Sequence, residues 1–293
     1  MKWILVILLI PTLSCQQNEE SAQFYKAVYN LDNAIDSAEF LIWKKTHLTK
    51  VDSGEVISLM VQDSIPLGDL YYENDEYLVF GYCAGEFGGA LLFQDKDQPD
   101  SLYYLQSTCP VMIDNRDNGF YIVESLAHGS GHSRVRFFDT PRNLDRVHTD
   151  SISTNWKNRK YPGLGDHEIW EKFDSQGKVL VDTNRLMFNI LFPHKDENYL
   201  IYTGYGNTYL GMLTNKGLKT VDTLVNVPSW RYSDSPNHII DNMINGYYHY
   251  NYATHDGYSN DKTIRKTVFS GDIYAKGDSI IIAYKNSDSI ESK

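Results

Sequence analysis

Four segments of the chain repeat one pattern, in which two apolar runs flank a short turn rich in Asn, Asp, Glu and Gly. They read GDLYYENDEYLVFGYC, CPVMIDNRDNGFYIVES, LMFNILFPHKDENYLIYTGYG and HIIDNMINGYYHYNY. Alternating apolar runs on both sides of turn residues indicate β-hairpins. We therefore expect an all-β protein, because a period of two residues matches a strand and not a helix.

Each of these hairpins is followed by a second alternating segment that holds a turn of its own. The expected second turns lie at residues 95–100, 139–141, 215–217 and 270–272. Two hairpins make a four-stranded antiparallel unit. These units recur about every 40–50 residues, with one gap of about twice that length, and such a period is typical of β-propellers.

The expected fold is a β-propeller of about five to six four-stranded blades over residues 46–293. Four blades come directly from the repeat, a fifth is expected between residues 145 and 182, and one more would join residues 40–64 to the C-terminal strand 279–284. Small sheets with two apolar faces bury both of them when they stack around an axis. A large β-sandwich or an open meander is the alternative.

A different periodicity precedes the repeats. Phe24, Val28, Leu31 and Ile35 are spaced by four, three and four residues, which favours an amphipathic helix. We expect a helix within residues 24–45, either packed against the β domain or acting as a spacer.

The N-terminus has the shape of a secretory signal. One lysine precedes an apolar run at residues 4–10, which is too short to cross a bilayer as a helix, and no later stretch is long enough to do so. Thr12-Leu13-Ser14-Cys15 resembles the lipobox of bacterial lipoproteins, although Thr12 replaces the usual leucine. The resemblance implies a signal peptide over residues 1–14 and an acyl chain on Cys15. An ordinary signal peptide with an unmodified cysteine is the alternative.

Residues 15–23 read as a polar, acidic tether, which resembles the surface-export signals of Bacteroidota lipoproteins. GYCAGEFGGALLF and TCPVMIDNRDNGFYIVESLAHGSGHS also resemble Bacteroidota lipoproteins that carry a β-propeller-like domain. These resemblances imply a lipid anchor in the cell envelope, at the periplasmic face of the outer membrane or at the cell surface. They imply no activity.

Charge narrows the classes of partner. The chain has 38 acidic and 27 basic residues and a net charge of −11, which argues against nucleic acid and anionic headgroups as partners. The 22 tyrosines suit half-buried strands, and they also suit binding faces. The oligomeric state does not follow from these features.

Two cysteines remain beside Cys15. Cys83 and Cys109 form an even pair in an exported protein, so a disulfide between them is one expectation and two buried thiols are the other. No CxxC motif or His partner lies at metal-ligand spacing, so we expect no metal site and no cofactor.

Three loops hold candidate ligand-binding residues. Glu86 lies in the glycine-rich GYCAGEFGGA, His128 and His132 flank Gly-Ser-Gly, and His255 and Asp256 lie in YATHDGYSNDK. Imidazoles and carboxylates in neighbouring loops can converge on one ligand. Each stretch is also an ordinary turn, since Gly supplies positive φ there.

No complete catalytic constellation is present. GDHEIWE lacks the second histidine of H-E-x-x-H, and the chain has no G-x-S-x-G. We therefore assign no catalytic residue and expect a non-catalytic module that binds a carbohydrate, peptide or protein partner. The alternatives are a carboxylate-based glycoside hydrolase or lyase, and an envelope protection or immunity protein.

Overall fold

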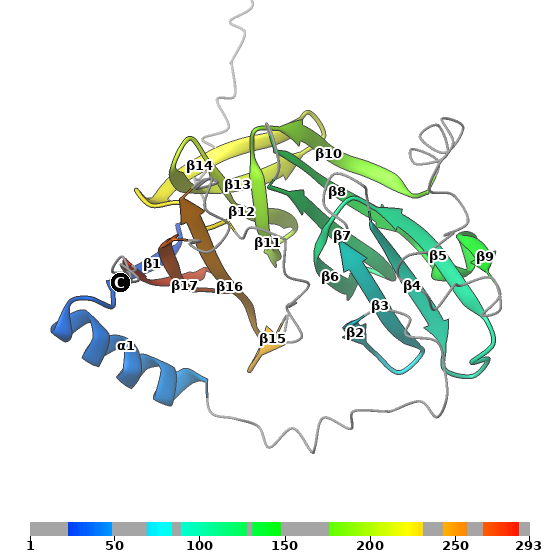
Figure 1. The fold of residues 1–293 in the computed structure, drawn as a ribbon, viewed down its shortest axis with the longest axis horizontal. Coiled ribbons are helices and arrows are strands. Elements are labelled where there is room, and N and C mark those ends of the chain that lie inside the picture. The colour runs from blue at the N-terminus through cyan, green and yellow to red at the C-terminus, as the bar shows by residue number, and fades with distance from the viewer. Residues whose placement is uncertain are drawn as a thin grey trace, which may run out of the picture.

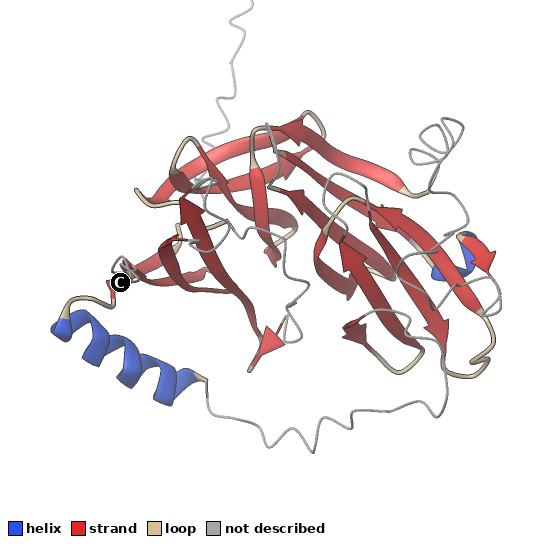
Figure 2. Cartoon of the chain, viewed as in Figure 1, coloured by secondary structure: helices blue, strands red, loops and turns tan. Residues whose placement is uncertain are grey.

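A computed structural model describes most of the β domain and the segment that precedes it. The described residues are 23–48, 69–83, 89–127, 131–147, 176–230, 243–256 and 266–286. They form four open antiparallel-rich sheets and one α-helix (Figure 2). The expected all-β class is confirmed. The described residues hold four sheets, and not five or six.

The sheets are numbered I to IV in chain order, with strands given in spatial order. Sheet I contains β2 (Asp69–Glu73), β3 (Tyr77–Cys83), β4 (Gly89–Asp95), β5 (Leu102–Ser107) and β9 (Asp145–Val147). Sheet II contains β10 (Lys178–Asn184), β8 (His132–Phe138), β7 (Gly119–Leu126) and β6 (Pro110–Arg116).

Sheet III contains β11 (Met187–His194), β12 (Glu197–Gly204), β13 (Asn207–Thr214) and β14 (Gly217–Val225). Sheet IV contains β15 (Met243–Ile244), β16 (Tyr247–Asp256), β17 (Lys266–Lys276), β18 (Ser279–Asn286) and β1 (Tyr25–Asn30). The helix α1 spans Ala34–His47, and a short 3₁₀ helix, η2, spans Pro141–Asn143. Figure 1 shows the four sheets following one another in an arc.

The sheets stack because their strands are apolar on both faces. In β7, Phe120 and Ile122 pack into a core shared with sheet I, whereas Tyr121 and Val123 pack into a core shared with sheets III and IV. Successive side chains of a strand point to opposite faces, so both faces of sheet II are covered. Strands buried on both sides read as nearly continuous apolar runs, and β7 is an example.

The first hairpin of each sheet has its turn on the same side of the molecule, and this side is here called the hairpin end. Asn74, between β2 and β3, donates its amide to Asn115 Oδ1 of β6 at 3.3 Å. Tyr248, just after the β15–β16 turn, donates its hydroxyl to Asp114 Oδ2 of β6 at 3.2 Å. Because strands alternate in direction, β3, β7, β12 and β16 all run from this end toward the opposite one, here called the loop end.

The helix covers the outer face of sheet IV. Asn33 caps it by accepting a hydrogen bond from the Ile35 N–H at 2.9 Å, and basic side chains occupy its last turn. Phe40 and Trp43 pack against Tyr274, with ring centroids 6.3 Å and 5.3 Å away. No helix among the residues that the structure describes is long and apolar enough to cross a membrane.

The helix predicted within residues 24–45 is correct only from Ala34 onward. Residues Tyr25–Asn30 form β1, which pairs in parallel with β18. Apolar residues spaced by three and four positions also occur where a strand, a turn and a helix follow one another, as they do here. The exposed edge of β18 decides between them, because its unpaired backbone groups bind a strand but not a helix.

The turn predicted at residues 270–272 is wrong. Gly271 lies in the middle of β17, where a Cβ atom would collide with the Ala283 carbonyl oxygen and lie 2.9 Å from the Tyr284 Cα. The glycine therefore permits close approach of β18. The turn between the two strands is at Gly277, which has a φ of 55°.

The second hairpin predicted after His132 is also wrong. Most of the span predicted to hold an extra blade, residues 148–175, lies outside the described residues, and its described ends, β9 and β10, belong to sheets I and II. After β8, η2 leads the chain back to sheet I, where β9 pairs with β5. Arg142 binds Asp95 at 3.0 Å, and Arg146 binds the Ser101 hydroxyl at 2.8 Å. β10 then completes sheet II beside β8. The closing pairing predicted for residues 40–64 is not formed by β18, whose partners are β17 and β1.

Candidate functional site

Side chains from all four sheets meet at the hairpin end of the molecule. We call Asp114, Arg116, Asp117, Tyr121 and Tyr248 the central cluster. Strands of neighbouring sheets contact one another, namely β2 with β6, β6 with β11, and β11 with β16. Sheets II and IV supply the cluster itself, and sheets I and III supply its neighbours Tyr72 and Asn198.

Alternation along β6 explains the charged part of the central cluster. Met112, Asp114 and Arg116 share one face of the strand, so a carboxylate and a guanidinium follow an apolar side chain toward the centre. The strand ends in a two-residue turn at Asp117 and Asn118, with φ values of 54° and 58°. Both residue types tolerate this left-handed conformation.

Asp114 is a buried carboxyl with two hydrogen-bond partners. It accepts from Arg116 Nε at 2.5 Å and from the Tyr248 hydroxyl at 3.2 Å. Burial raises the pKa of the Asp114 carboxyl above its usual range, and the nearby guanidinium and tyrosine hydroxyl offset only part of that shift.

Arg116 joins both carboxylates of the central cluster. Its Nη1 lies 3.5 Å from Asp117 Oδ2, and its Cζ lies 4.1 Å from the centre of the Tyr121 ring. Its Nη2 is buried and has no hydrogen-bond partner among the described residues. The guanidinium is therefore held between a ring and two carboxylates, with one buried donor left unused.

Tyrosines surround the charged groups. Tyr121 donates its hydroxyl to Asp117 at 3.1 Å, and Asn198 hydrogen-bonds to the same hydroxyl. Burial is the main cause that raises the pKa of Tyr248 and of Tyr72, and the neighbouring Asp114 adds to both shifts. The phenols are therefore neutral at physiological pH and can both donate and accept hydrogen bonds.

Sequence reasoning missed the central cluster. The available signal was the pair of opposite charges at Asp114 and Arg116, two residues apart at the end of the apolar run Val111–Ile113. Charged residues on one face of a buried strand are rare unless they are paired. Which tyrosine reaches Asp114 could not be seen, because Tyr248 is 134 residues away in the chain.

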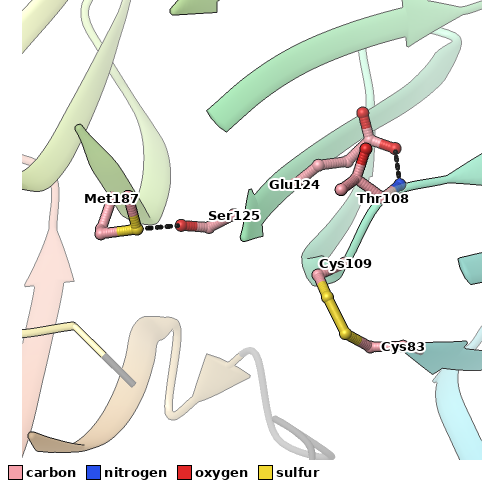
Figure 3. The surroundings of a disulfide bond; sticks show 6 residues. All are labelled: Cys83, Thr108, Cys109, Glu124, Ser125 and Met187. Carbon is pink, nitrogen blue, oxygen red and sulfur yellow. Dashed lines mark hydrogen bonds between the residues drawn. A yellow bond between two sulfur atoms is a disulfide. The ribbon is translucent and has the colours of Figure 1, made fainter. Parts of the chain in front are cut away.

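The structure joins Cys83 and Cys109 by a disulfide, with Cα atoms 4.7 Å apart (Figure 3). The bond links the end of β3 in sheet I to the residue before β6 in sheet II, at the loop end. Close by, Thr108 donates its N–H to Glu124 at 3.3 Å, and the Ser125 hydroxyl lies 3.8 Å from the Met187 sulfur. The disulfide therefore fastens two neighbouring sheets together.

A second ion pair is sealed between sheets I and II. Arg136 Nη2 lies 2.5 Å from Glu124 Oε1 and 2.5 Å from the Gln106 carbonyl oxygen, and the two charged side chains are 0 % and 1 % exposed. Glu124 Oε2, Arg136 Nε and Arg136 Nη1 have no partner among the described residues. The pair links β5 to β7 and β8 from inside the core.

His132 is paired with a carboxylate on a neighbouring strand. It begins β8, and its Nε2 lies 2.7 Å from Asp182 Oδ1 on the neighbouring strand β10. Arg134 binds the same carboxylate at 2.6 Å. His132 thus takes part in a cross-strand network within sheet II, at the loop end and away from the central cluster.

His255 and Asp256 lie at the end of β16, opposite Thr267 and Lys266 of β17. Tyr248 stands seven residues earlier on the same strand, which is about 23 Å at the rise of a β-strand. These two residues therefore belong to the loop end and not to the central cluster. Glu86, His128 and Cys15 lie outside the described residues.

No three His, Cys, Asp or Glu side chains are grouped to hold a metal ion within the described part of the chain. The central cluster offers two carboxylates to one guanidinium, so its own arginine already neutralises part of their charge. Its chemistry is that of hydrogen bonding and of proton exchange at Asp114.

No protein-family model matches the chain, and neither does any curated protein sequence. Among solved structures, the chain is similar to an α-L-arabinofuranosidase (CtGH43) from Clostridium thermocellum ATCC 27405. That match has a TM-score of 0.30 and 13 % sequence identity, and it covers 76 % of this chain and 70 % of the other. At this TM-score the likeness supports no conclusion about the fold or activity of this chain.

Proposed function

We propose that this protein is an envelope lipoprotein whose β domain binds a carbohydrate at the central cluster without cleaving it. The observation that carries the proposal is the gathering of polar side chains from four sheets around Asp114, Arg116 and Tyr121. Tyrosine rings offer flat apolar faces to a sugar ring, and Asp114, Asp117 and Arg116 offer acceptors and donors for hydroxyls. Peptide and protein ligands are the other outcomes of the binding test.

The fold proposal is an open β-propeller. The first strands of sheets I, II and III contact one another in turn, the first strand of sheet III also contacts β16 of sheet IV, and the first hairpins share one end. In such an arrangement ligands are held where the first strands meet. The helix α1 covers the face of sheet IV that another blade would otherwise cover.

The binding test is a calorimetric titration of the purified protein with neutral and acidic oligosaccharides. Replacing Arg116 with Met removes the unused donor, and Tyr248→Phe removes only the hydroxyl that reaches Asp114. We expect each change to weaken binding at least about tenfold, as losing a hydrogen bond to a charged group does. Arg142→Met is the matched control, because Arg142 is largely exposed and lies outside the central cluster.

Unchanged affinity in folded Arg116→Met and Tyr248→Phe would place the ligand elsewhere. Melting temperatures show whether each variant is folded. A wild-type protein that binds peptides or proteins but no oligosaccharide would overturn the carbohydrate assignment.

A glycoside hydrolase is the second candidate, and the raised pKa of Asp114 favours it. A buried carboxyl with a raised pKa is a candidate general acid, and Asp117 is a second carboxylate on the same arginine. Release of reducing sugar by wild type and its loss in Asp114→Asn would establish this activity. Absence of turnover with a ligand that binds would support the binding module.

The proposed anchor is Cys15, and the motivation is its place after the apolar run of residues 4–10. Fractionation of cells that express wild type or Cys15→Ala tests it. Release of the variant into the soluble envelope fraction is expected, because two acyl chains hold a protein on a membrane and their removal frees it. Equal membrane retention of both proteins would refute the anchor.

A further inference from the structure

Large exposed apolar side chains gather in one short part of the described chain. The structure exposes seven of them among the described residues, and five lie within residues 25–42: Tyr25, Val28, Ile35, Leu41 and Ile42. Scattered exposed apolar residues are ordinary, whereas a contiguous group marks an interaction surface. This group is also the part of the described chain closest in sequence to Cys15.

The helix α1 is apolar on two sides. Phe40 and Trp43 face sheet IV, whereas Ile35, Leu41 and Ile42 are 68 %, 61 % and 67 % exposed. A surface helix normally carries apolar residues only on the side that faces the core. The outward side of α1 therefore carries three large apolar side chains beside the exposed Lys45, and these three have no cover among the described residues.

Strand β1 adds one exposed aromatic ring on the face of sheet IV that α1 covers. Ala27 and Tyr29 pack into the cluster that holds α1, and Tyr25 shares their face of the strand because side chains alternate. Tyr25 is 62 % exposed. We call Tyr25, Ile35, Leu41 and Ile42 the apolar face.

The short chain between Cys15 and Phe24 would keep the domain close to a membrane that holds a lipid on Cys15. Phe24 is fixed on sheet III, with its ring 4.7 Å from His194 and 4.9 Å from Tyr199. Only eight residues separate it from Cys15, so a lipid on Cys15 holds Phe24 within about 30 Å of the bilayer.

We propose that the apolar face rests in the interface of the bilayer and lays the domain on its side, with α1 parallel to the membrane. This inference rests on the proposed lipidation of Cys15. Apolar side chains of a surface helix bury themselves at the boundary of headgroups and acyl chains, and tyrosine suits the same depth. The net charge of −11 means that the contact depends on apolar burial and not on anionic lipids.

The first test uses the mature chain with Cys15→Ala and vesicles of phosphatidylcholine. We expect it to float with the vesicles and to lose about tenfold or more in partitioning when Leu41 and Ile42 become serine. Glu39→Ser/Lys45→Ser is the matched control: two exposed residues of the same helix are replaced, the net charge is unchanged, and partitioning stays at the Cys15→Ala level.

The second test uses the acylated protein with an environment-sensitive fluorophore on a cysteine at Ile42 or at Lys216, an exposed residue in the β13–β14 turn. A blue shift on vesicles at position 42 and none at 216 is expected. Equal, water-like emission at both positions, together with no flotation of the Cys15→Ala chain, overturns the proposal.

Two further outcomes distinguish the membrane contact from a dimer interface and from the proposed lipid anchor. A dimer that dissociates when Leu41 and Ile42 become serine would assign the apolar face to a second copy of the chain and overturn the membrane contact. If native protein is not acylated in cells, the anchor proposal fails, while flotation of the Cys15→Ala chain still reports on the apolar face alone.

Discussion

Breaking the buried pair of Glu124 and Arg136 tests how sheets I and II are held together. The two side chains are 1 % and 0 % exposed, so removing either one leaves the other charge inside the core. An uncompensated buried charge costs about 3–5 kcal/mol of the free energy of unfolding. We therefore expect Glu124→Met and Arg136→Met each to destabilise the protein by that amount.

The double variant should be far milder than the sum of the two single variants. It leaves no buried charge, and it removes three polar atoms that have no partner among the described residues. It orphans the Thr108 N–H and the Gln106 carbonyl, which costs about 1–3 kcal/mol each before relaxation. A net loss of about 2 kcal/mol, against a sum of about 6–10, implies a coupling energy of at least about 4 kcal/mol.

Urea unfolding followed by tryptophan fluorescence, with the disulfide intact, measures all three variants. Glu73→Gln is the control, because its ion pair with Lys96 is largely exposed and such pairs contribute less than about 1 kcal/mol. A double variant as unstable as the two single losses combined would refute the reasoning, since the side chains would then act independently.

Three further outcomes are expected from the structure. Replacing Cys83 and Cys109 with serine should lower the free energy of unfolding by about 3 kcal/mol, because the bond closes a loop across a separation of 26 residues; urea curves before and after reduction check this. Tyr205→Asn should raise stability by about 1 kcal/mol in thermal melts, since Tyr205 is 81 % exposed at a φ of 54°, a conformation that asparagine tolerates better; a lower melting temperature would contradict it. Burial tends to raise the pKa of Asp272, but hydrogen bonds from His249 and Asn251 lower it overall. Its stabilising contribution is therefore present above about pH 4 and lost as the pH falls, so wild type should lose more stability than Asp272→Asn between pH 6 and pH 3.

The parts of the fold that sequence predicted well are local. Sheet III follows its two predicted hairpins, with the 215–217 turn between β13 and β14. There, alternation, turn residues and chain order all favour the same pairing, and neighbouring strands pair with each other. The turn at residues 95–100, between β4 and β5, was predicted for the same reason.

The errors have one cause, which is contact between residues far apart in the chain. Gly271 has the composition of a turn, yet β18 approaches its backbone and keeps it in a strand. The segment after Pro141 has the composition of a hairpin, yet Arg142 and Arg146 bind sheet I and draw β9 across to it. Local composition carries no information about such partners.

The candidate site also divides into features that the sequence predicts and features that depend on tertiary contacts. The sequence by itself determined the all-β class, the repeat, the acidic charge and the pairing candidates Cys83 and Cys109, because periodicity and composition act within a few residues. Only the tertiary structure decided that Asp114, Arg116 and Tyr248 meet, and that Ile35, Leu41 and Ile42 stay exposed on α1. The physical reason is that burial and hydrogen-bond partners across sheets depend on how the sheets stack, and stacking is a property of the whole chain.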